Sequence, residues 1–305
     1  MRDIILETHG LTKDYGKGRG IFDIDLEVKK GEVFGFIGTN GSGKTTTIRN
    51  MMGFIKPDQG SSRVCGMDSW TQSAEIMKQV SYVPGEIAFP SLATGTAFLK
   101  SQAEYLGVTD FSYMNHVIEL LQLDPTANLK RMSKGMKQKT AIAAALMGEK
   151  EVLILDEPTT GLDPLMRDAF LELVREEKKK GHTVFMSSHI FEEIEEVCDR
   201  VAMIKDGHII DIVSLYDLRH PKEKKFIVEF ADSQEKDRFI ENTSFVISSH
   251  DSSSCQINIS TTELNSLFGV LKNYQIQYLQ EVHLSLQKHF MQIYKEGTQG
   301  YERKE

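Results

Sequence analysis

The sequence is poor in cysteine and has no long apolar run. Its three cysteines, Cys65, Cys198 and Cys255, lie far apart among 305 residues and include no CxxC pair. We therefore expect buried, reduced thiols rather than a disulfide framework or a cysteine metal site. No apolar run approaches the roughly 20 residues that span a bilayer. The first residues, MRDIILETHG, contain no apolar core of the kind found in signal peptides. The chain is expected not to cross a membrane by itself.

An excess of basic residues is also missing. The chain has 36 Lys and Arg against 44 Asp and Glu, for a net charge of −8 and a pI of about 5.7. This balance argues against a dedicated nucleic-acid binder, whose binding domain is usually basic. The hydrophobic fraction of 40% and the charged fraction of 26% are ordinary for a globular protein. They exclude a collagen, a disordered tail and a coiled-coil rod, and the length predicts one to two domains.

Proline is absent after Pro221, which lies in the charged stretch RHPKEKK. We interpret this stretch as a linker, and we place one domain at residues 1–220 and another at 221–305. In the first, apolar strand-like runs alternate with helical stretches, as in α/β folds. In the second, the predicted order is strand, helix, strand, strand, helix, strand, which suits a small ferredoxin-like α+β module. Its predicted elements are 226–230, 233–242, 245–248, 256–259, 262–273 and 275–279, followed by a helix over 284–294.

A glycine-rich loop follows the predicted strand Phe34–Ile37 and precedes a predicted helix at 46–52. It matches the pattern GxxxxGK[ST] and reads Gly38, Thr39, Asn40, Gly41, Ser42, Gly43, Lys44 and Thr45, with Thr46 beginning the helix. Glycines let backbone N–H groups turn inward around phosphate oxygens, and a helix N-terminus adds its positive end. Lys44 is predicted to reach the β- and γ-phosphates, and Thr45 to offer a hydroxyl to Mg²⁺. The alternative is a chance glycine-rich turn.

Two carboxylates follow the apolar run Val152–Leu155. This run predicts a buried strand, and α/β folds bind ligands at the carboxyl ends of such strands. Asp156 is the natural Mg²⁺ partner for Thr45. Glu157 is placed to polarise a water for attack on the γ-phosphate. The alternative is a pair of solvated acids at a helix cap, which the upstream phosphate loop disfavours.

The residues 156–163, Asp-Glu-Pro-Thr-Thr-Gly-Leu-Asp, resemble those of the ABC ATPase family. Residues 131–138, Arg-Met-Ser-Lys-Gly-Met-Lys-Gln, resemble its signature Leu-Ser-Gly-Gly-Gln, with Ser133 and Gly135 matching. This variant is similar to the one in ATP-binding subunits of ABC-2 type exporters. The resemblance covers roughly residues 3–220. It implies a P-loop ABC ATPase cassette with a RecA-like core, an antiparallel β subdomain and a helical subdomain at about 86–135.

The resemblance also implies individual roles. Tyr15, in Lys-Asp-Tyr-Gly, would stack on adenine, and His189, in Ser-Ser-His, would sense the γ-phosphate. Two cassettes would hold two ATPs head to tail. Ser133 and Gly135 of one cassette would then bind the γ-phosphate in the other, and Asp163 would link the two sites. Each residue has a structural alternative, such as packing for Tyr15 or an ordinary polar contact for His189.

One departure from the family pattern affects the metal site. The family has a glutamine after Tyr-(Leu/Val)-Pro that contacts Mg²⁺ and the attacking water. Here Gly85 stands at that position in Ser-Tyr-Val-Pro-Gly-Glu, followed by Glu86. Two alternatives remain open, namely that Glu86 substitutes for the glutamine or that water fills the gap.

Two charged clusters are interpreted as surface. One is acidic and consists of Glu192, Glu193, Glu195 and Glu196. The other is basic and consists of Lys130, Arg131, Lys134, Lys137 and Lys139. Although a basic cluster can bind nucleic acid, a solvated face is the simpler interpretation in an acidic chain.

The function favoured is an ATPase subunit that uses ATP and Mg²⁺ to drive export through a separate membrane permease. It is expected to form a homodimer or heterodimer of cassettes and to lie in the cytoplasm on the inner face of the membrane, with no nucleic-acid partner. One alternative is an importer ATPase. Another is a nucleic-acid- or ribosome-directed ABC ATPase, but residues 45–156 leave no room for a long coiled coil and only one phosphate loop is found. A P-loop kinase would not need the signature.

Overall fold

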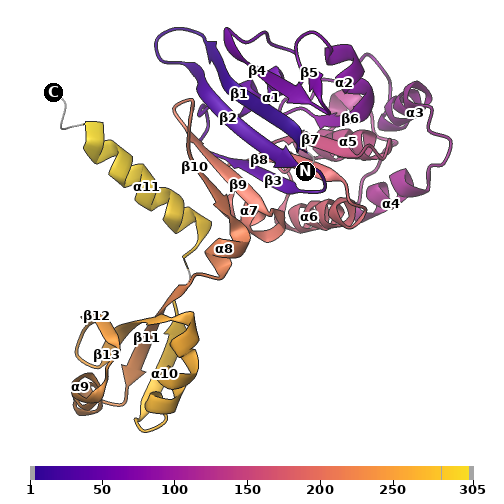
Figure 1. Cartoon of the computed structure of the whole chain (residues 1–305). Helices are drawn as coiled ribbons and strands as arrows, with labels where there is room; N and C mark the ends of the chain where they lie inside the picture. The colour runs from indigo at the N-terminus through magenta and orange to yellow at the C-terminus, as the bar shows by residue number, and fades with distance from the viewer. Residues whose placement is uncertain (1–3, 283, 302–305) are drawn as a thin grey trace. The chain divides into compact units, whose positions relative to one another are not determined.

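The computed structural model describes residues 4–282 and 284–301. The chain divides into two compact units, Met1–Leu215 and Tyr216–Glu305 (Figure 1). The sequence placed the division five residues later, at 220/221. In the described ranges no helix combines the length and apolar character that a membrane span requires.

A six-stranded sheet forms the centre of the first unit, in the order β10-β9-β3-β8-β7-β6. All neighbours in it run parallel except β10, which pairs antiparallel with β9. Its strands are β3 (Val33–Ile37), β6 (Val80–Val83), β7 (Val152–Asp156), β8 (Thr183–Ser188), β9 (Arg200–Lys205) and β10 (His208–Ser214). Every residue of β3, β7 and β8 is buried, as expected for parallel strands covered on both faces.

A second, antiparallel sheet has the order β2-β1-β4-β5. Its strands are β1 (Ile4–Asp14), β2 (Gly20–Lys29), β4 (Gln59–Val64) and β5 (Met67–Asp68). In β2, buried and exposed residues alternate over its second half, so one face of the strand packs inward. That face shares one hydrophobic core with the central sheet, in which Leu26 of β2 joins Ile48 and Phe185. Burial of this shared face ties the antiparallel sheet to the phosphate-loop helix.

Three α-helices of the first unit follow a residue whose side chain caps them. The side chains of Thr94, Ser133 and Asp163 each accept a hydrogen bond from a backbone N–H in the first turn. The helices are α1 (Lys44–Met51), α2 (Ser73–Gln79), α3 (Gly95–Leu106), α4 (Ser112–Leu120), a 3-10 turn (Leu129–Arg131), α5 (Lys134–Leu146), α6 (Pro164–Lys179) and α7 (Phe191–Val197), with α8 (Leu215–Arg219) following at the division. Figure 1 shows α3 and α4 on the side of this unit away from β10.

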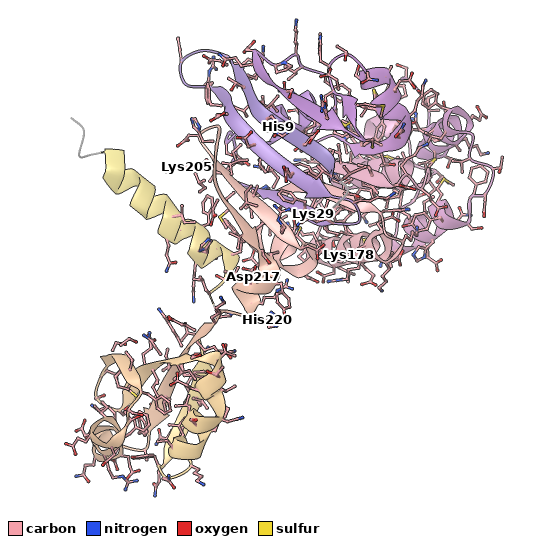
Figure 2. All side chains as sticks on the ribbon, viewed as in Figure 1. His9, Lys29, Lys178, Lys205, Asp217 and His220 are labelled. Atoms are coloured by element: carbon pink, nitrogen blue, oxygen red, sulfur yellow. The ribbon has the colours of Figure 1, made fainter. Side chains whose placement is uncertain are left out.

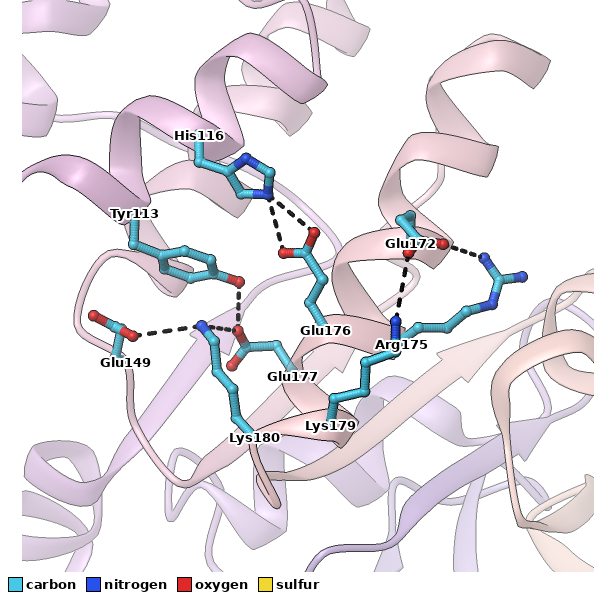
Figure 3. A network of polar contacts seen from close by, with 9 residues as sticks. All are labelled: Tyr113, His116, Glu149, Glu172, Arg175, Glu176, Glu177, Lys179 and Lys180. Carbon is cyan, nitrogen blue, oxygen red and sulfur yellow. Dashed lines mark hydrogen bonds and ion pairs between the residues drawn. The ribbon is translucent and has the colours of Figure 1, made fainter.

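A polar network joins α4 to α6 (Figure 3). The carboxylate of Glu177 is almost fully buried and accepts hydrogen bonds from the Tyr113 hydroxyl and from Lys180 Nζ, the latter at 2.9 Å. Lys180 Nζ also lies 3.2 Å from the centre of the Tyr113 ring, a cation–π contact. His116 Nε2 lies 3.0 Å from Glu176 Oε1. These contacts connect α4 to the C-terminal end of α6.

Contacts with two carboxylates, Asp199 and Glu32, also position the central sheet. Lys178 of α6, labelled in Figure 2, donates to Asp199 Oδ1 at 2.6 Å, and Asp199 Oδ2 accepts from the N–H of Val33 at 3.0 Å. The N–H of Lys29, also labelled there, donates to Glu32 Oε2 at 2.9 Å. The start of β3, which leads into the phosphate loop, is therefore held from two sides.

The second unit contains an antiparallel sheet in the order β12-β13-β11-β14. Its elements are β11 (Glu223–Phe230), α9 (Ser233–Asn242), β12 (Val246–His250), β13 (Ser254–Ser260), a 3-10 turn (Thr261–Glu263), α10 (Leu264–Leu271), β14 (Ile276–Glu281) and α11 (Leu286–Tyr301). Phe239 of α9 and Leu267 of α10 pack with Val228 and Ile257 in one core. Both helices therefore cover the same face of the sheet, as in a split βαβ arrangement.

Candidate functional site

Three neighbouring strands of the central sheet end at one edge. Strand β8 lies between β3 and β7, with Ile37 opposite Ser188 and Asp156 opposite Ser187 in the register. The phosphate loop leaves β3, His189 follows β8, and Glu157 follows β7. Because parallel strands share their carboxyl edge, this register brings together segments that are far apart in the sequence.

The phosphate loop needs glycine at defined positions. Gly43, which precedes α1, has a φ of 115°, and a Cβ there would lie 2.7 Å from Ile21 Cγ2. A Cβ on Gly38 would lie 2.4 Å from the carbonyl oxygen of Ile204 and 2.6 Å from Ser42 Oγ. The loop is therefore pressed against β2 and β9, and only residues without a side chain fit at these positions.

Lys44 is 4% exposed, yet its ammonium group has several oxygen partners. Its Nζ donates to the carbonyl oxygens of Gly38 at 2.8 Å and Thr39 at 3.2 Å. It also lies 3.2 Å from Glu157 Oε1. The ammonium group of Lys44 therefore lies inside the phosphate loop, where a bound anion would contact it.

Asp156 is completely buried at the end of β7. Its Oδ1 accepts from Ser187 Oγ at 2.7 Å, and the same hydroxyl oxygen accepts from the N–H of Glu157 at 2.9 Å. Its Oδ2 is a buried oxygen without a hydrogen-bond partner among the described residues. Burial raises the pKa of Asp156 above its ordinary value, although Ser187 and Thr45 act in the opposite direction. A bare carboxylate oxygen beside a threonine hydroxyl is a donor set that suits Mg²⁺.

Glu157 adopts a φ of 47°, in the left-handed region that non-glycine residues occupy at a cost of about 1–3 kcal/mol. Its carboxylate lies between the side chains of Lys44 and His189, with Oε1 at 3.2 Å from Lys44 Nζ and Oε2 at 3.3 Å from His189 Nδ1. Burial acts to raise the pKa of Glu157, but Lys44 and His189 outweigh it and leave the pKa below its ordinary value. The group is therefore ionised near neutral pH and able to accept a proton.

A cleft of about 480 Å³ opens beside this cluster. Its lining includes Tyr15, which is 48% exposed, together with Lys44 and Glu157. Other predicted site residues on its walls are Asn40, Gly41, Gly43, Thr45 and Thr46. An aromatic ring and a buried ammonium in the same cleft fit a ligand with a flat base and a phosphate chain.

The cleft also has walls that the sequence analysis missed. They are Gly18, Arg19, Gly20, Asp206 and Gly207. The N–H of Gly207, in the turn between β9 and β10, donates to the carbonyl of Ser42 at 2.9 Å. The turn consists of Asp206 and Gly207, and no local sequence pattern connects it to the phosphate loop.

Eight predicted residues do not line this cleft, and they are Gly38, Thr39, Ser42, Asp156 and His189, described above, and Ser133, Gly135 and Asp163. Ser133 caps α5 and accepts from the N–H of Met136 at 3.2 Å, and Asp163 caps α6 and accepts from Met166 at 3.0 Å. A Cβ on Gly135 would lie 2.7 Å from the carbonyl oxygen of Gly161, so the signature packs closely on the segment after Glu157. The side chains of Ser133 and Asp163 are exposed, which leaves them accessible to another molecule.

Gly85 lies beside the metal-site carboxylate. An added Cβ at this position would be 3.1 Å from Asp156 Oδ2. Glu86 is exposed to solvent. The backbone of residue 85 thus occupies the edge of Asp156 where the family pattern has a glutamine.

Comparison with known proteins identifies the chain. Residues 21–160 match a family model described as ABC transporter. The bacitracin transport ATP-binding protein BcrA of Bacillus licheniformis is 34% identical over 75% of this chain and 76% of its own length. The chain belongs to the ABC transporter ATP-binding proteins. It is also 32% identical to the Nod factor export ATP-binding protein I of Ralstonia nicotianae, over 68% of this chain and 66% of that protein.

The solved structures agree with this assignment. A structure of the ATP binding subunit of an ABC transporter matches with a TM-score of 0.63 and 30% identity, over 71% of this chain and 92% of the other. The first unit is therefore an ABC ATPase cassette, as the motifs predicted. As a member of this family, the chain is an ATP-binding and ATP-hydrolysing subunit of an ABC transporter.

Proposed function

We propose that this ABC ATPase binds ATP with Mg²⁺ in the cleft described above and uses its hydrolysis to drive export through a separate permease. The observation that carries the proposal is the position of Glu157, held between Lys44 and His189 beside the bare oxygen of Asp156. Tyr15 stacks on the adenine, and the loop residues Gly38 to Thr46 bind the phosphates. Lys44 neutralises the phosphate charge after releasing its present contact with Glu157.

The residues fit a magnesium ion. Thr45 and Asp156 would hold it, because Asp156 Oδ2 is buried without a hydrogen-bond partner among the described residues and the Thr45 hydroxyl lowers the pKa of the same carboxyl group. When bound, the ion neutralises charge on the β- and γ-phosphates. Water and phosphate oxygens would supply the remaining ligands, because Gly85 brings no side chain to this edge.

In this proposal, Glu157 is the general base for ATP hydrolysis. Its carboxylate accepts a proton from a water whose oxygen attacks the γ-phosphorus, and the bond from phosphorus to the bridging oxygen breaks to release ADP and phosphate. The lowered pKa keeps Glu157 ionised for this step. His189, whose Nδ1 lies 3.3 Å from Glu157, contacts the γ-phosphate from the neighbouring strand end.

The exposed signature supports a head-to-tail dimer of cassettes. Ser133 stands at the N-terminus of α5, where free N–H groups favour an anion. Neither Ser133 nor Gly135 lines the cleft of its own chain. We assign both to the γ-phosphate bound by a second cassette, identical or related, and Asp163 to the link between the two sites.

A groove of about 240 Å³ supports the permease assignment. Its walls come from α2, α3, α5, β6 and residues 84 and 87–89, and they include Tyr105 and Met77, which are 82% and 50% exposed. The rings of Phe89 and Phe98 meet there with centroids 4.7 Å apart. An apolar groove of this kind fits an amphipathic helix. We propose that a cytoplasmic helix of the permease occupies it and holds the chain on the inner face of the membrane.

The export direction rests on the Ser-Lys-Gly-Met-Lys-Gln signature variant and on relatives whose names include bacitracin transport and Nod factor export.

A direct test of the export direction uses the full chain reconstituted with its permease in proteoliposomes, with the cassettes facing outward. An exporter is stimulated by compounds supplied on the cassette side. Stimulation only from the opposite side would identify an importer, and recovery of ribosomes or DNA in place of a permease would overturn the transport function.

The groove has its own test. Tyr105→Glu introduces a charge into the groove without touching the nucleotide cleft, so it is expected to release the permease while basal ATP hydrolysis is retained. Retention of the permease by this variant would show that it binds elsewhere. Lys100→Glu is the matched control because Lys100 is an exposed residue of the same helix that does not line the groove.

A further inference from the structure

Glu193 is a buried carboxylate close to the catalytic edge. It belongs to α7, the short helix after His189, and is only 4% exposed, whereas its neighbours Glu192 and Glu196 are exposed. The interpretation of this acidic cluster as a solvated face is therefore wrong for Glu193. A buried carboxylate is costly unless other groups compensate for the loss of water.

One oxygen of Glu193 joins two segments. Its Oε2 accepts from Thr159 Oγ1 at 2.9 Å and from Ser188 Oγ at 3.0 Å. Ser188 Oγ in turn accepts from the N–H of Ile190 at 3.0 Å. Ser188 and Ile190 flank His189, and Thr159 follows Glu157 by two positions. The carboxylate therefore holds the turn that carries His189 and the turn that carries Glu157.

The other oxygen faces a third segment. Glu193 Oε1 is buried and has no hydrogen-bond partner in the described ranges, and Arg167 Nε lies 4.0 Å from it. Arg167 Nε donates to the carbonyl of Leu162 at 3.3 Å. Leu162 immediately precedes Asp163, so the contact reaches the segment assigned to the link between cassettes.

The burial and the polar contacts of the Glu193 carboxylate fit a positioning role. Burial raises the pKa of Glu193, while the two hydroxyls, Arg167 and His189 act in the opposite direction. A buried ionisable group adds little stability compared with a well-packed apolar side chain of similar size. Three loops that must keep a common geometry meet at this carboxylate.

We propose that Glu193 is a positioning residue for ATP hydrolysis. It keeps the turn that carries Glu157 and the turn that carries His189 in a fixed position relative to each other. The proposal rests on the roles assigned to those two residues under the proposed function. Glu193 acts through Thr159 and Ser188 and does not itself contact nucleotide. Displacement of a reacting group by about 1 Å can cost on the order of 100-fold in rate.

The experiment compares Glu193→Leu with Glu193→Gln in the full chain. Leucine removes both acceptor contacts, so kcat is expected to fall roughly 10- to 100-fold, while KM for ATP changes less than about threefold because the phosphate loop is untouched. Glutamine keeps one oxygen for Thr159 and Ser188 and is expected to retain most of the rate. Glu192→Leu, an exposed residue of the same helix, is the matched control and is expected to match wild type.

A double-mutant cycle separates positioning from folding. Thr159→Val is expected to lower kcat, and combining it with Glu193→Leu should lower kcat no further, because both changes break the same hydrogen bond. Wild-type kcat in Glu193→Leu would overturn the proposal, as would a parallel loss of ATP binding and thermal stability with no rescue by glutamine. Glu157→Gln, measured alongside, separates this result from the proposed function. If Glu157→Gln keeps full turnover, the general-base assignment fails and the positioning role fails with it.

Discussion

Lys44 Nζ lies 3.2 Å from Glu157 Oε1, so the ammonium of the phosphate loop is paired with the carboxylate that follows β7. The pair is largely shielded, since Lys44 is 4% exposed and the Glu157 side chain 22% exposed. Charges in such a site interact more strongly than in water. Phosphate oxygens must compete with Glu157 for contact with Lys44. Nucleotide binding is therefore coupled to the release of Glu157, the proposed base, from this ion pair.

Glu157→Gln is expected to reduce ATP hydrolysis by roughly 10²- to 10⁴-fold, the usual contribution of a general base. ATP binding should persist, because Lys44 loses a competing anion and the phosphate loop is unchanged. A stable ATP-bound dimer should accumulate. Phosphate release, equilibrium ATP titration and light scattering measure these three effects, and wild-type turnover would contradict the assignment.

Tyr15→Ala is expected to weaken ATP binding by about 1–3 kcal/mol, the scale of base–aromatic stacking. Tyr15→Phe keeps the ring and should bind ATP nearly as well as wild type. Titration with a fluorescent ATP analogue measures the difference between the variants. Equal affinity for all three proteins would show that Tyr15 packs on its neighbours and does not bind the base.

Gly85→Ala is expected to raise the Mg²⁺ concentration required for half-maximal hydrolysis. Its Cβ would lie 3.1 Å from Asp156 Oδ2, closer than most Cβ contacts, and would crowd the proposed ligand oxygen. Glu86→Ala is expected to change the Mg²⁺ dependence little, because Glu86 points to solvent-accessible space. A larger effect at Glu86 than at Gly85 would support Glu86 as the substitute for the missing glutamine.

Glu177 should make stability depend on pH. Burial acts to raise its pKa, but hydrogen bonds from Tyr113, His182 and Lys180 outweigh it and hold the pKa below the ordinary value of 4.5. A lowered pKa means that the stabilisation is complete above pH 4.5 and is lost as the pH falls through the folded-state pKa. Denaturant unfolding from about pH 5 to about pH 3 should therefore show a smaller loss of stability in Glu177→Gln than in wild type.

The same variant should be less stable at neutral pH by about 1–3 kcal/mol, since it weakens buried hydrogen bonds. Glu176→Gln is the matched control, because Glu176 is a more exposed residue that contacts His116. Its effect should be within about 0.5 kcal/mol of wild type. Parallel pH curves for wild type and Glu177→Gln would contradict the role of this carboxylate in fastening α4 to α6.

The predicted elements of the second unit show where local patterns are sufficient. The helix predicted at 233–242 coincides with α9, which Asp232 caps by accepting from the N–H of Glu235. The helix predicted at 262–273 begins differently, because Ser260 and Glu263 form a capping box around a 3-10 turn and α10 starts only at Leu264. Periodicity located the apolar face, whereas side-chain hydrogen bonds to the backbone set the helix start.

By itself, the sequence determined the phosphate loop, the paired carboxylates of Asp156 and Glu157 and the family, because these depend on residue types at short, fixed spacings. Only the tertiary structure decided that Gly207 binds the phosphate loop, that Ser133 lies outside the cleft of its own chain and that Glu193 is buried against Thr159 and Ser188. Such contacts join segments that are distant in the chain. They follow from strand order and register, which no local pattern specifies.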